Sequence, residues 1–469
     1  MNCKIFGKTL IMHKITAKDF PHLDFGDVRR NARFVTLIDN ISKRPGSSIP
    51  LQSKSWYEAK ATYGFFRNKE VTKESLQRTI AAYGKSQVED FNQLLIIHDI
   101  SNISFTGLQA EGLGYLDNKE GRGIMCYNSI AASIEGLPLA LMHQQTWTRP
   151  VEELGKAKDR KQRNFEDKET YKWYEGITEV NKTLGRDIQK IHIADKGADV
   201  YELFFSAFES DTDLLIRACH NRKLGDGSHL WDHITQQDMQ GVITLEIPDA
   251  KGRRKLPKEA EVRYEKVEIL RPSTSNDKYQ SVELTAIEVR QVGEVKSEED
   301  RICWRLLTTL EVTSLSDVLK YIKWYTYRWL IERFHYVLKS GTKIEELQLK
   351  QAESLQKAIS VYSLAAFRIM QLVYQSRHHA EVSCEVILTR QQWIAMYVLI
   401  HQNNKMPDEP PSLSQAVKWI GRLGGHLGRK SDGPPGLKTV WLGYQRVCDL
   451  ASSYEILNEI LTLKNLGKG

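Results

Sequence analysis

The chain has 469 residues, of which 41% are hydrophobic and 27% are charged, a composition that excludes a disordered or collagen-like chain. No stretch approaches the roughly 18 consecutive apolar residues that a membrane-spanning helix needs, and residues 1–10 lack the pattern of a secretory signal. The six cysteines are scattered without a Cys-x-x-Cys pair, which argues against disulfides and a zinc ribbon and favours a cytoplasmic protein.

The net charge of +7 is concentrated near the N-terminus. Residues 29–85 hold twelve Lys and Arg against four Asp and Glu, so the rest of the chain is close to neutral. Such a segment is typical of a module that contacts phosphates, although a solvated basic surface without a partner is the alternative. We therefore expect an N-terminal extension at residues 1–26, followed by a DNA-binding domain at residues 27–88.

The DNA-binding domain is predicted to be helical. One helix is expected over residues 26–41, with Arg30 and Arg33 one turn apart, and a second over residues 55–67, where aromatic residues recur at helical spacing. Both arginines are candidate DNA contacts, because guanidinium groups bind phosphate oxygens and few acids surround them.

A pattern of alternating strands and helices begins near residue 94. Strands are expected at 94–99, 128–134 and 137–147, a helix at 166–184, a strand at 191–195, a helix at 200–208 and a strand at 214–217. This order is that of a ribonuclease H-like α/β core, whose first part we place at residues 89–219.

The predicted core is interrupted before it is complete. Residues 220–300 hold strand-like stretches among charged and Gly/Pro turns, and they are predicted to be a β-rich insertion. An apolar strand at residues 304–310 and a long helix from about residue 316 resume the core over residues 301–375. Residues 376–469 are predicted to form a helical C-terminal domain.

Two acids stand at the ends of predicted strands. Asp99 ends the strand at residues 94–99, and Asp195 ends the strand at residues 191–195. Ligands of α/β sheets bind at the carboxyl ends of strands, so the two carboxylates would face each other if their strands are neighbours. Carboxylate oxygens are ligands that Mg²⁺ prefers. A turn residue without a ligand is the alternative at either position.

The helix after residue 316 carries a sharper signal. Tyr325, Arg328, Glu332 and Lys339 lie at offsets of 0, 3, 7 and 14, which at about 100° per residue places them on one face roughly 60° wide. Apolar burial does not explain a phenol, a guanidinium, a carboxylate and an ammonium on one face. A salt-bridged surface, with Arg328 paired to Glu332, is the alternative.

The pattern Tyr-x-x-Arg-x-x-x-Glu-x-x-x-x-x-x-Lys that these four residues form resembles the signature of a large family of bacterial insertion-sequence cut-and-paste transposases. The acids also stand at the family's spacing, 96 residues from Asp99 to Asp195 and 137 from Asp195 to Glu332. Further shared segments lie at residues 26–30, 65–68, 143–144, 149–150 and 422–425. The resemblance covers most of the chain, from about residue 27 to residue 450.

The resemblance implies a metal-dependent DNA transposase. Asp99, Asp195 and Glu332 would bind two Mg²⁺ ions, with Mn²⁺ as a substitute, and catalyse a nick at the element end, hairpin formation, hairpin opening and joining to target DNA. The partners would be double-stranded DNA, as element ends and target, and a second copy of the chain in a homodimer on paired ends. The helix after Leu450 is the candidate dimer contact.

Further residues acquire roles through the same resemblance. The residues that would hold DNA phosphates are Tyr325, Arg328, Lys339 and, near the phosphate that is cut, Arg217. Trp304 matches an aromatic residue that stacks on a flipped base, with a core tryptophan as the alternative. Tyr336 stands where the family has a lysine, so the phosphate contact of that lysine is not carried over to this chain. Residues before Met12 have no family counterpart, so Met12 is a candidate natural start.

Two alternatives to a transposase stay open on the sequence alone. A ribonuclease H-like nuclease would cut DNA and leave free ends, whereas a transposase joins a 3′-OH end to new DNA. A non-catalytic relic would bind element ends without cutting them. The intact set of three acids favours an active enzyme, because a decayed copy would lose acids at random.

Overall fold

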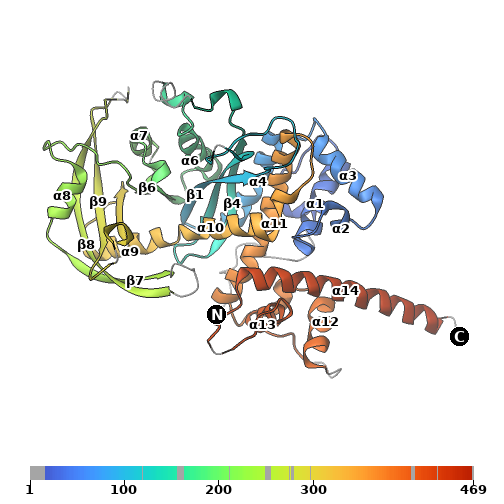
Figure 1. Cartoon of the computed structure of the whole chain (residues 1–469). Coiled ribbons are helices and arrows are strands. Elements are labelled where there is room, and N and C mark those ends of the chain that lie inside the picture. The colour runs from blue at the N-terminus through green and yellow to red at the C-terminus, as the bar shows by residue number, and fades with distance from the viewer. Residues whose placement is uncertain are drawn as a thin grey trace.

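A computed structural model shows a mixed α/β protein with one large sheet and helical N- and C-terminal parts (Figure 1). The blue N-terminal helices lie at one end of the molecule and the green and yellow insertion at the other, while the red α14 projects away from the body (Figure 1). The candidate start Met12 lies outside the described residues. The structure describes residues 16–118, 120–155, 163–210, 212–248, 255–273, 275, 279–295, 297–402, 407–429 and 431–466.

The two predicted N-terminal helices are confirmed, and two more accompany them. The helices are α1 (Val28–Lys43), α2 (Ile49–Gln52), α3 (Trp56–Arg67) and α4 (Lys73–Val88). α1, α3 and α4 begin after Asp27, Ser55 and Thr72, whose side chains accept backbone N–H groups of the first turn. Phe34 and Ile38 of α1 are fully buried, so this helix packs into the common core.

The predicted order of strands and helices in the first part of the core is confirmed. The elements are β1 (Gln93–Ser104), β2 (Gly114–Tyr115), β3 (Arg122–Ala132), β4 (Pro138–Trp147), α6 (Tyr171–Leu184), β5 (Gln189–Ala194), α7 (Tyr201–Glu209) and β6 (Asp213–Arg217). Their order in the sheet is β4-β3-β1-β5-β6, with β1 antiparallel to β3 and parallel to β5, and β5 parallel to β6. The carboxyl ends of the parallel strands β1, β5 and β6 therefore lie at the same edge of the sheet.

The first strand is longer than predicted. β1 does not end at Asp99 but continues to Ser104, because β3 stays paired with it as far as Gly123 opposite Ser104. The residues after Asp99 include polar ones, so the apolar pattern that predicts a strand stops before the strand does. Pairing with β5 stops earlier, at His98 opposite Ala194. Asp99 therefore lies inside a strand, one position past the end of the parallel pairing.

The insertion strands are confirmed, but they extend the core sheet instead of forming a sheet of their own. The elements are α8 (Leu230–Gln236), β7 (Gly241–Pro248), β8 (Lys255–Leu270), β9 (Ser281–Gln291) and, directly after the insertion, β10 (Cys303–Thr308). β10 pairs with β6 on one side and with β9 on the other, which continues the order as β6-β10-β9-β8-β7. The result is one ten-stranded sheet.

The long helix predicted from residue 316 is interrupted. It consists of α9 (Leu315–Thr326), a turn at Tyr327 and Arg328, α10 (Trp329–Tyr336) and a short π-helix (Val337–Gly341). A rotation of about 100° per residue does not hold across a turn and a π-helix. The prediction of a single straight face from Tyr325 to Lys339 is therefore wrong.

The C-terminal part is helical, as predicted. The helices are α11 (Ala352–His378), α12 (Arg390–His401), α13 (Leu413–Leu423) and α14 (Leu437–Leu466). α11 is buried along almost its whole length and contacts α1, α4, β4 and α13, so it joins the N-terminal helices to the sheet and to the C-terminal helices. None of the helices in the described ranges is long and apolar enough to cross a membrane.

Candidate active site

The register of β1 and β5 brings Asp99 and Asp195 to the same edge of the sheet. The last pair between these strands is His98 and Ala194, and each aspartate is the next residue along its chain. The two carboxylates therefore start at the same level on neighbouring strands, as the sequence predicts. Asp195 also begins a 3-10 turn in which its Oδ1 accepts the Gly197 N–H at 2.8 Å.

The electrostatics of Asp195 reflect this crowding. Its pKa is raised, chiefly by burial and further by the negative charge of Asp99, while the Gly197 N–H and the positive charges of Arg328 and Lys196 oppose the rise. The negative charge of Asp99 therefore opposes ionisation of Asp195 in this partly buried site. A divalent cation between them would offset that charge, so the donor set fits a hard metal ion.

Glu332 joins the two aspartates through Arg328. The Arg328 Nη2 lies 2.6 Å from Glu332 Oε1, so the expected ion pair forms, but the Arg328 side chain is only 12% exposed and the pair is not a surface pair. Burial lowers the pKa of Arg328, yet the neighbouring Tyr325, Glu332 and Asp99 outweigh it and the pKa is raised. The guanidinium is therefore paired with Glu332, and its positive charge also acts on Asp99 and Asp195.

A cavity of about 300 Å³ opens beside Asp195. Arg217, Tyr325 and Arg328 line it, so three predicted DNA contacts meet next to a predicted metal ligand. Tyr325 is 4% exposed, and its hydroxyl makes no hydrogen bond of ordinary geometry with any described residue, with the Arg328 guanidinium beside it as a partial partner. Because a buried hydroxyl without a partner is costly, an oxygen of a bound ligand would stabilise it.

Trp304 and Lys339 lie on opposite sides of this group. The ring of Trp304 meets the Tyr325 ring edge to face, with 5.5 Å between centroids, and one part of the indole packs on the core. Lys339, in the π-helix, lies near Cys126, where its charge opposes the burial that raises the pKa of the thiol to about 12. Cys126 belongs to β3, so Lys339 is on the β3 side of Asp99, away from the cavity.

Comparison with known proteins identifies the family. Three family models match the chain in order: transposase DNA-binding over residues 12–71, transposase DDE domain over residues 175–367 and transposase Tn5 dimerisation domain over residues 364–455. The chain belongs to the DDE transposases of the Tn5 type. The cryo-EM structure of a piggyBac transposase synaptic complex with hairpin DNA aligns with a TM-score of 0.38 and 10% identity, covering 80% of this chain and 74% of that chain.

A row of buried polar side chains leads to Asp99 in the transposase. His335 Nδ1 lies 3.5 Å from Asp99 Oδ2, and His335 Nε2 lies 3.0 Å from the side-chain nitrogen of Asn128. Asn128 in turn accepts a hydrogen bond of 2.8 Å from the Gln144 side chain. Because the amide nitrogen of Asn128 only donates, Nε2 of His335 accepts from it, and the proton of the neutral imidazole is on Nδ1, which faces Asp99. The network therefore selects one tautomer of the imidazole.

Sequence reasoning missed His335. The signal that could have found it is indirect: Asn128 and Gln144 are polar residues inside two neighbouring strands, and both are buried. Buried amides need partners, so their positions indicate a polar network below the site.

We expect His335→Leu to lower the rate of DNA cleavage about 10- to 100-fold, because Asp99 is a predicted metal ligand and partners of metal ligands have effects of this size. His335→Asn keeps an N–H donor toward Asp99 and should lose less. Single-turnover cleavage and direct Mn²⁺ binding to the DNA-free protein would measure both variants. Equal losses in the two variants, with Mn²⁺ binding unchanged, would show that His335 only fills space.

The two predicted DNA contacts on α1 also have partners within the protein. Arg30 Nη1 donates to the Phe25 carbonyl, and Arg33 Nη1 lies 3.8 Å from Glu58 Oε1. A guanidinium has five N–H donors, so each arginine retains donors for phosphate. Arg29, which sequence reasoning did not single out, has a side chain that is 88% exposed and is a further basic residue on the same helix.

Trp329 is a second residue that sequence reasoning missed. It is 49% exposed at the start of α10, and the Arg328 guanidinium lies 5.3 Å from the centre of its ring. An exposed indole beside an arginine of the site is the kind of surface on which a nucleic-acid base stacks. Trp329 directly follows Arg328 of the signature, so the sequence shows that it is close to the site. Its exposure depends on the turn before α10, which the sequence does not show.

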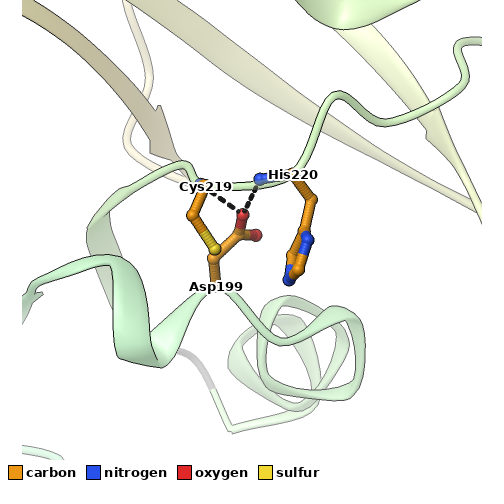
Figure 2. Close-up of side chains that lie close together, drawn as sticks. All are labelled: Asp199, Cys219 and His220. Atoms are coloured by element: carbon orange, nitrogen blue, oxygen red, sulfur yellow. Dashed lines mark hydrogen bonds between the residues drawn. The ribbon is translucent and has the colours of Figure 1, made fainter. Parts of the chain in front are cut away.

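Asp199, Cys219 and His220 form a separate group of potential metal ligands (Figure 2). The Oδ2 of Asp199 accepts the backbone N–H groups of Cys219 and His220 at 2.7 and 3.0 Å (Figure 2). Its Oδ1 accepts two N–H groups of Arg222, and the carboxylate is fully buried. Because both oxygens are used, this group fixes the loop after β6, which places Cys219 at the cavity wall.

Proposed function

We propose that this transposase cuts DNA at the ends of its element and joins those ends to target DNA, with Asp99, Asp195 and Glu332 as metal ligands on a ribonuclease H-like core. The observation that carries the proposal is that the positive charge of Arg328 acts on Asp99 and Asp195 while its guanidinium is paired with Glu332, beside a cavity lined by basic side chains. A surface salt bridge between Arg328 and Glu332 would explain neither the influence of Asp99 and Asp195 nor the cavity.

The three acids suit Mg²⁺, with Mn²⁺ as a substitute. All three are carboxylates, and hard cations prefer oxygen ligands. Two bound ions would activate the attacking oxygen and stabilise the leaving oxygen of an in-line displacement. His335 orients Asp99 and the Gly197 N–H orients Asp195, so the ligands are held in place before catalysis begins.

The reaction would consist of four phosphoryl transfers in one site. Water cuts one strand at the element end and leaves a 3′-OH, which attacks the opposite strand to form a hairpin. Water then reopens the hairpin, and the 3′-OH attacks target DNA. Each step forms one P–O bond and breaks another, so only the nucleophile changes. Arg217, Tyr325 and Arg328 would hold the reacting phosphate, and Lys339 a phosphate on the β3 side of Asp99.

Trp304→Ala should slow hairpin formation roughly tenfold while the first nick stays close to the wild-type rate. The reason is that Trp304 would stack on a base flipped out when the strand bends, and such stacking contributes about 1–3 kcal/mol per base. Time courses on denaturing gels resolve the two products, and Trp304→Phe should retain most of the hairpin rate. Equal slowing of both steps would show that Trp304 is a core residue and does not stack on a flipped base.

Arg30→Ala with Arg33→Ala should weaken binding to the element's end and flatten its dependence on salt. Each lost phosphate contact lowers the slope of log affinity against log salt by about 0.9. Fluorescence anisotropy over a series of salt concentrations measures the slope. Lys182→Ala with Lys266→Ala removes the same charge from exposed sites on α6 and β8 and serves as the control. An unchanged slope in the arginine variant would place the contacts elsewhere.

The active form would be a homodimer on paired DNA ends. The Tn5 dimerisation match ends at residue 455, and α14 carries exposed apolar side chains along the same stretch and beyond it. These side chains are Tyr454, Ile456, Leu457 and Ile460. Neighbouring exposed apolar residues on a projecting helix are typical of a protein interface, which supports the helix after Leu450 as the dimer contact.

Incubation of the purified protein with its element's end DNA, with and without Mg²⁺, tests the proposal. The DNA that borders the gene supplies the end sequence. Nicks, hairpins and joined products that require Mg²⁺ are the expected result. Cutting without joining would favour a nuclease, and binding without cutting would favour a non-catalytic relic.

A further inference from the structure

The cavity beside Asp195 holds more positive charge than the predicted DNA contacts account for. Lys196, Arg217, Arg305 and Arg328 line it, against the single carboxylate of Asp195. Four cations around one acid favour an anionic ligand. Two of these residues, Lys196 and Arg305, have no role in the function proposed above, and Arg305 is the one that the surrounding structure holds most firmly.

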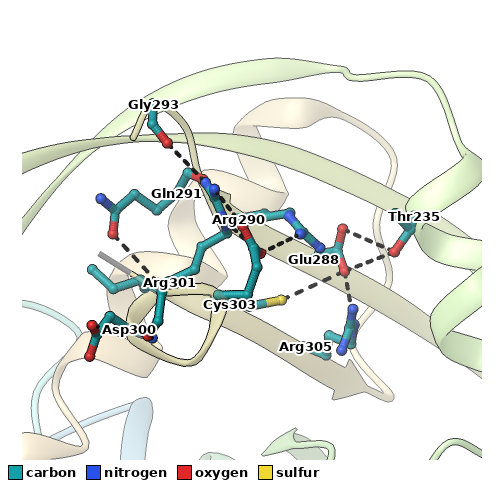
Figure 3. A network of polar contacts seen from close by, with 12 residues as sticks. Thr235, Glu288, Arg290, Gln291, Gly293, Asp300, Arg301, Cys303 and Arg305 are labelled. Atoms are coloured by element: carbon teal, nitrogen blue, oxygen red, sulfur yellow. Dashed lines mark hydrogen bonds and ion pairs between the residues drawn. The ribbon is translucent and has the colours of Figure 1, made fainter. Parts of the chain in front are cut away.

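Arg305 is fixed along one edge by a buried acid (Figure 3). On β10 it stands opposite Glu288 of β9, and its Nε donates to Glu288 Oε2 at 2.8 Å. Glu288 is fully buried, accepts a hydrogen bond of 3.3 Å from the Thr235 hydroxyl, and lies 4.0 Å from Arg263. A buried carboxylate that loses its closest cation is strongly destabilised, so Arg305 cannot easily swing away.

One face of the same guanidinium is covered by an aromatic ring. The Arg305 Cζ lies 4.9 Å from the centre of the Trp231 ring, which also lines the cavity. Trp231 belongs to α8 and Glu288 to β9, so both supports come from the insertion. Within the described residues, the two terminal nitrogens of Arg305 donate to no protein group. The guanidinium is therefore fixed in position, and the N–H donors on its outer edge remain available to a ligand.

We infer that Arg305, held by Glu288 and Trp231, binds a phosphodiester group of the DNA strand that enters the cavity beside the scissile phosphate. The two terminal nitrogens match the two free oxygens of such a group, and a guanidinium that is fixed in advance loses little freedom on binding. The insertion thus supplies one wall of the DNA-binding site. The inference rests on the proposed function, because that function makes Asp195 a ligand at the point of cutting.

The test combines Arg305→Ala with DNA ends in which one phosphate at a time near the cleavage position is an uncharged methylphosphonate. Affinity is measured without divalent metal, so that binding is separate from cutting. Arg305→Ala should weaken binding about tenfold, as expected for loss of a charged hydrogen bond. At one position, methylphosphonate should weaken the wild type by a similar factor and leave Arg305→Ala unaffected, because both changes remove the same contact.

Arg290→Ala is the matched control. Arg290 lies on β9 and forms an ion pair of 3.1 Å with Glu298 (Figure 3). It does not line the cavity. The substitution therefore removes the same charge from the same sheet without changing the cavity. Its effect should multiply with that of every methylphosphonate. If the loss of affinity from Arg305→Ala also multiplies with the loss from methylphosphonate at every position tested, the inference is overturned.

Two further variants separate folding from binding. Arg305→Lys keeps the charge without the paired nitrogens and should recover only part of the affinity, while Trp231→Leu removes the covering ring without touching Glu288 and should weaken the same coupling. Thermal unfolding shows whether each variant is folded. Failure of the proposed function would look different, since the wild type would then make no Mg²⁺-dependent nick even though the phosphate coupling is found.

Discussion

Asp195→Asn is expected to reduce DNA cleavage about a thousandfold or more while leaving binding to the element's end unchanged, and Asp99→Asn and Glu332→Gln should do the same. Metal ions contribute several kcal/mol of transition-state stabilisation, and about 4 kcal/mol corresponds to a factor of roughly 1,000. End binding should survive because the predicted end contacts lie on α1, far along the chain from the acids. Single-turnover cleavage and anisotropy on the same DNA measure the two properties.

The same variant should respond to metal in a way that an ordinary loss of stability would not. Burial and Asp99 raise the folded-state pKa of Asp195, so its charged form destabilises the folded protein as pH rises through that pKa. Asparagine is neutral at every pH, and the metal-free variant should unfold at or above the wild-type temperature at neutral pH. Mn²⁺ should then stabilise the wild type and not the variant. A variant that cuts DNA at the wild-type rate would remove Asp195 from the ligand set.

Arg328→Ala should lower cleavage about 10- to 100-fold and also destabilise the metal-free protein by roughly 1–3 kcal/mol. Both numbers follow from the loss of hydrogen bonds between charged groups. Arg328 is paired with Glu332 and lies close to Asp99, so its removal leaves the acids without their cation. Divalent metal should restore part of the lost stability, because it replaces that positive charge. Thermal unfolding with and without Mn²⁺ measures the effect.

Two controls sharpen the Arg328 experiment. Arg328→Lys keeps the charge but not the paired nitrogens, so stability should recover further than cleavage does. Arg333→Ala removes an exposed arginine from α10, which begins directly after Arg328, and should leave cleavage near the wild-type rate. If metal does not restore any stability to Arg328→Ala, the guanidinium has a packing role and is not a substitute for the cation.

The positions of the two strand acids could be predicted because strand ends are marked locally. An apolar run that stops at Asp195 coincides with the end of β5, since the next residues form a turn. The same reasoning placed the end of β1 too early. There the strand continues through the polar Ser101 and Asn102, because β3 supplies hydrogen-bonding partners as far as Gly123. Pairing between distant segments overrode the local pattern.

The interruption of the signature helix could not be predicted, since neither proline nor glycine marks the turn at Tyr327 and Arg328. Tyr325 and Arg328 line the cavity and Arg328 is paired with Glu332, whereas the charge of Lys339 acts on Cys126 of β3. The chemical identity of the signature was visible in the sequence. The division of its residues between the cavity and β3 was not.

The sequence by itself determined the family, the basic N-terminal segment and most of the helices and strands, and it supplied the three candidate acids, because each depends on residue identity or on local periodicity. Only the tertiary structure decided which groups stand next to the acids. Asn128 and His335 are 207 residues apart in the chain, yet 3.0 Å separates their side chains. Such pairs form because buried polar and charged groups must satisfy one another where the core brings them together, and local sequence does not specify those neighbours.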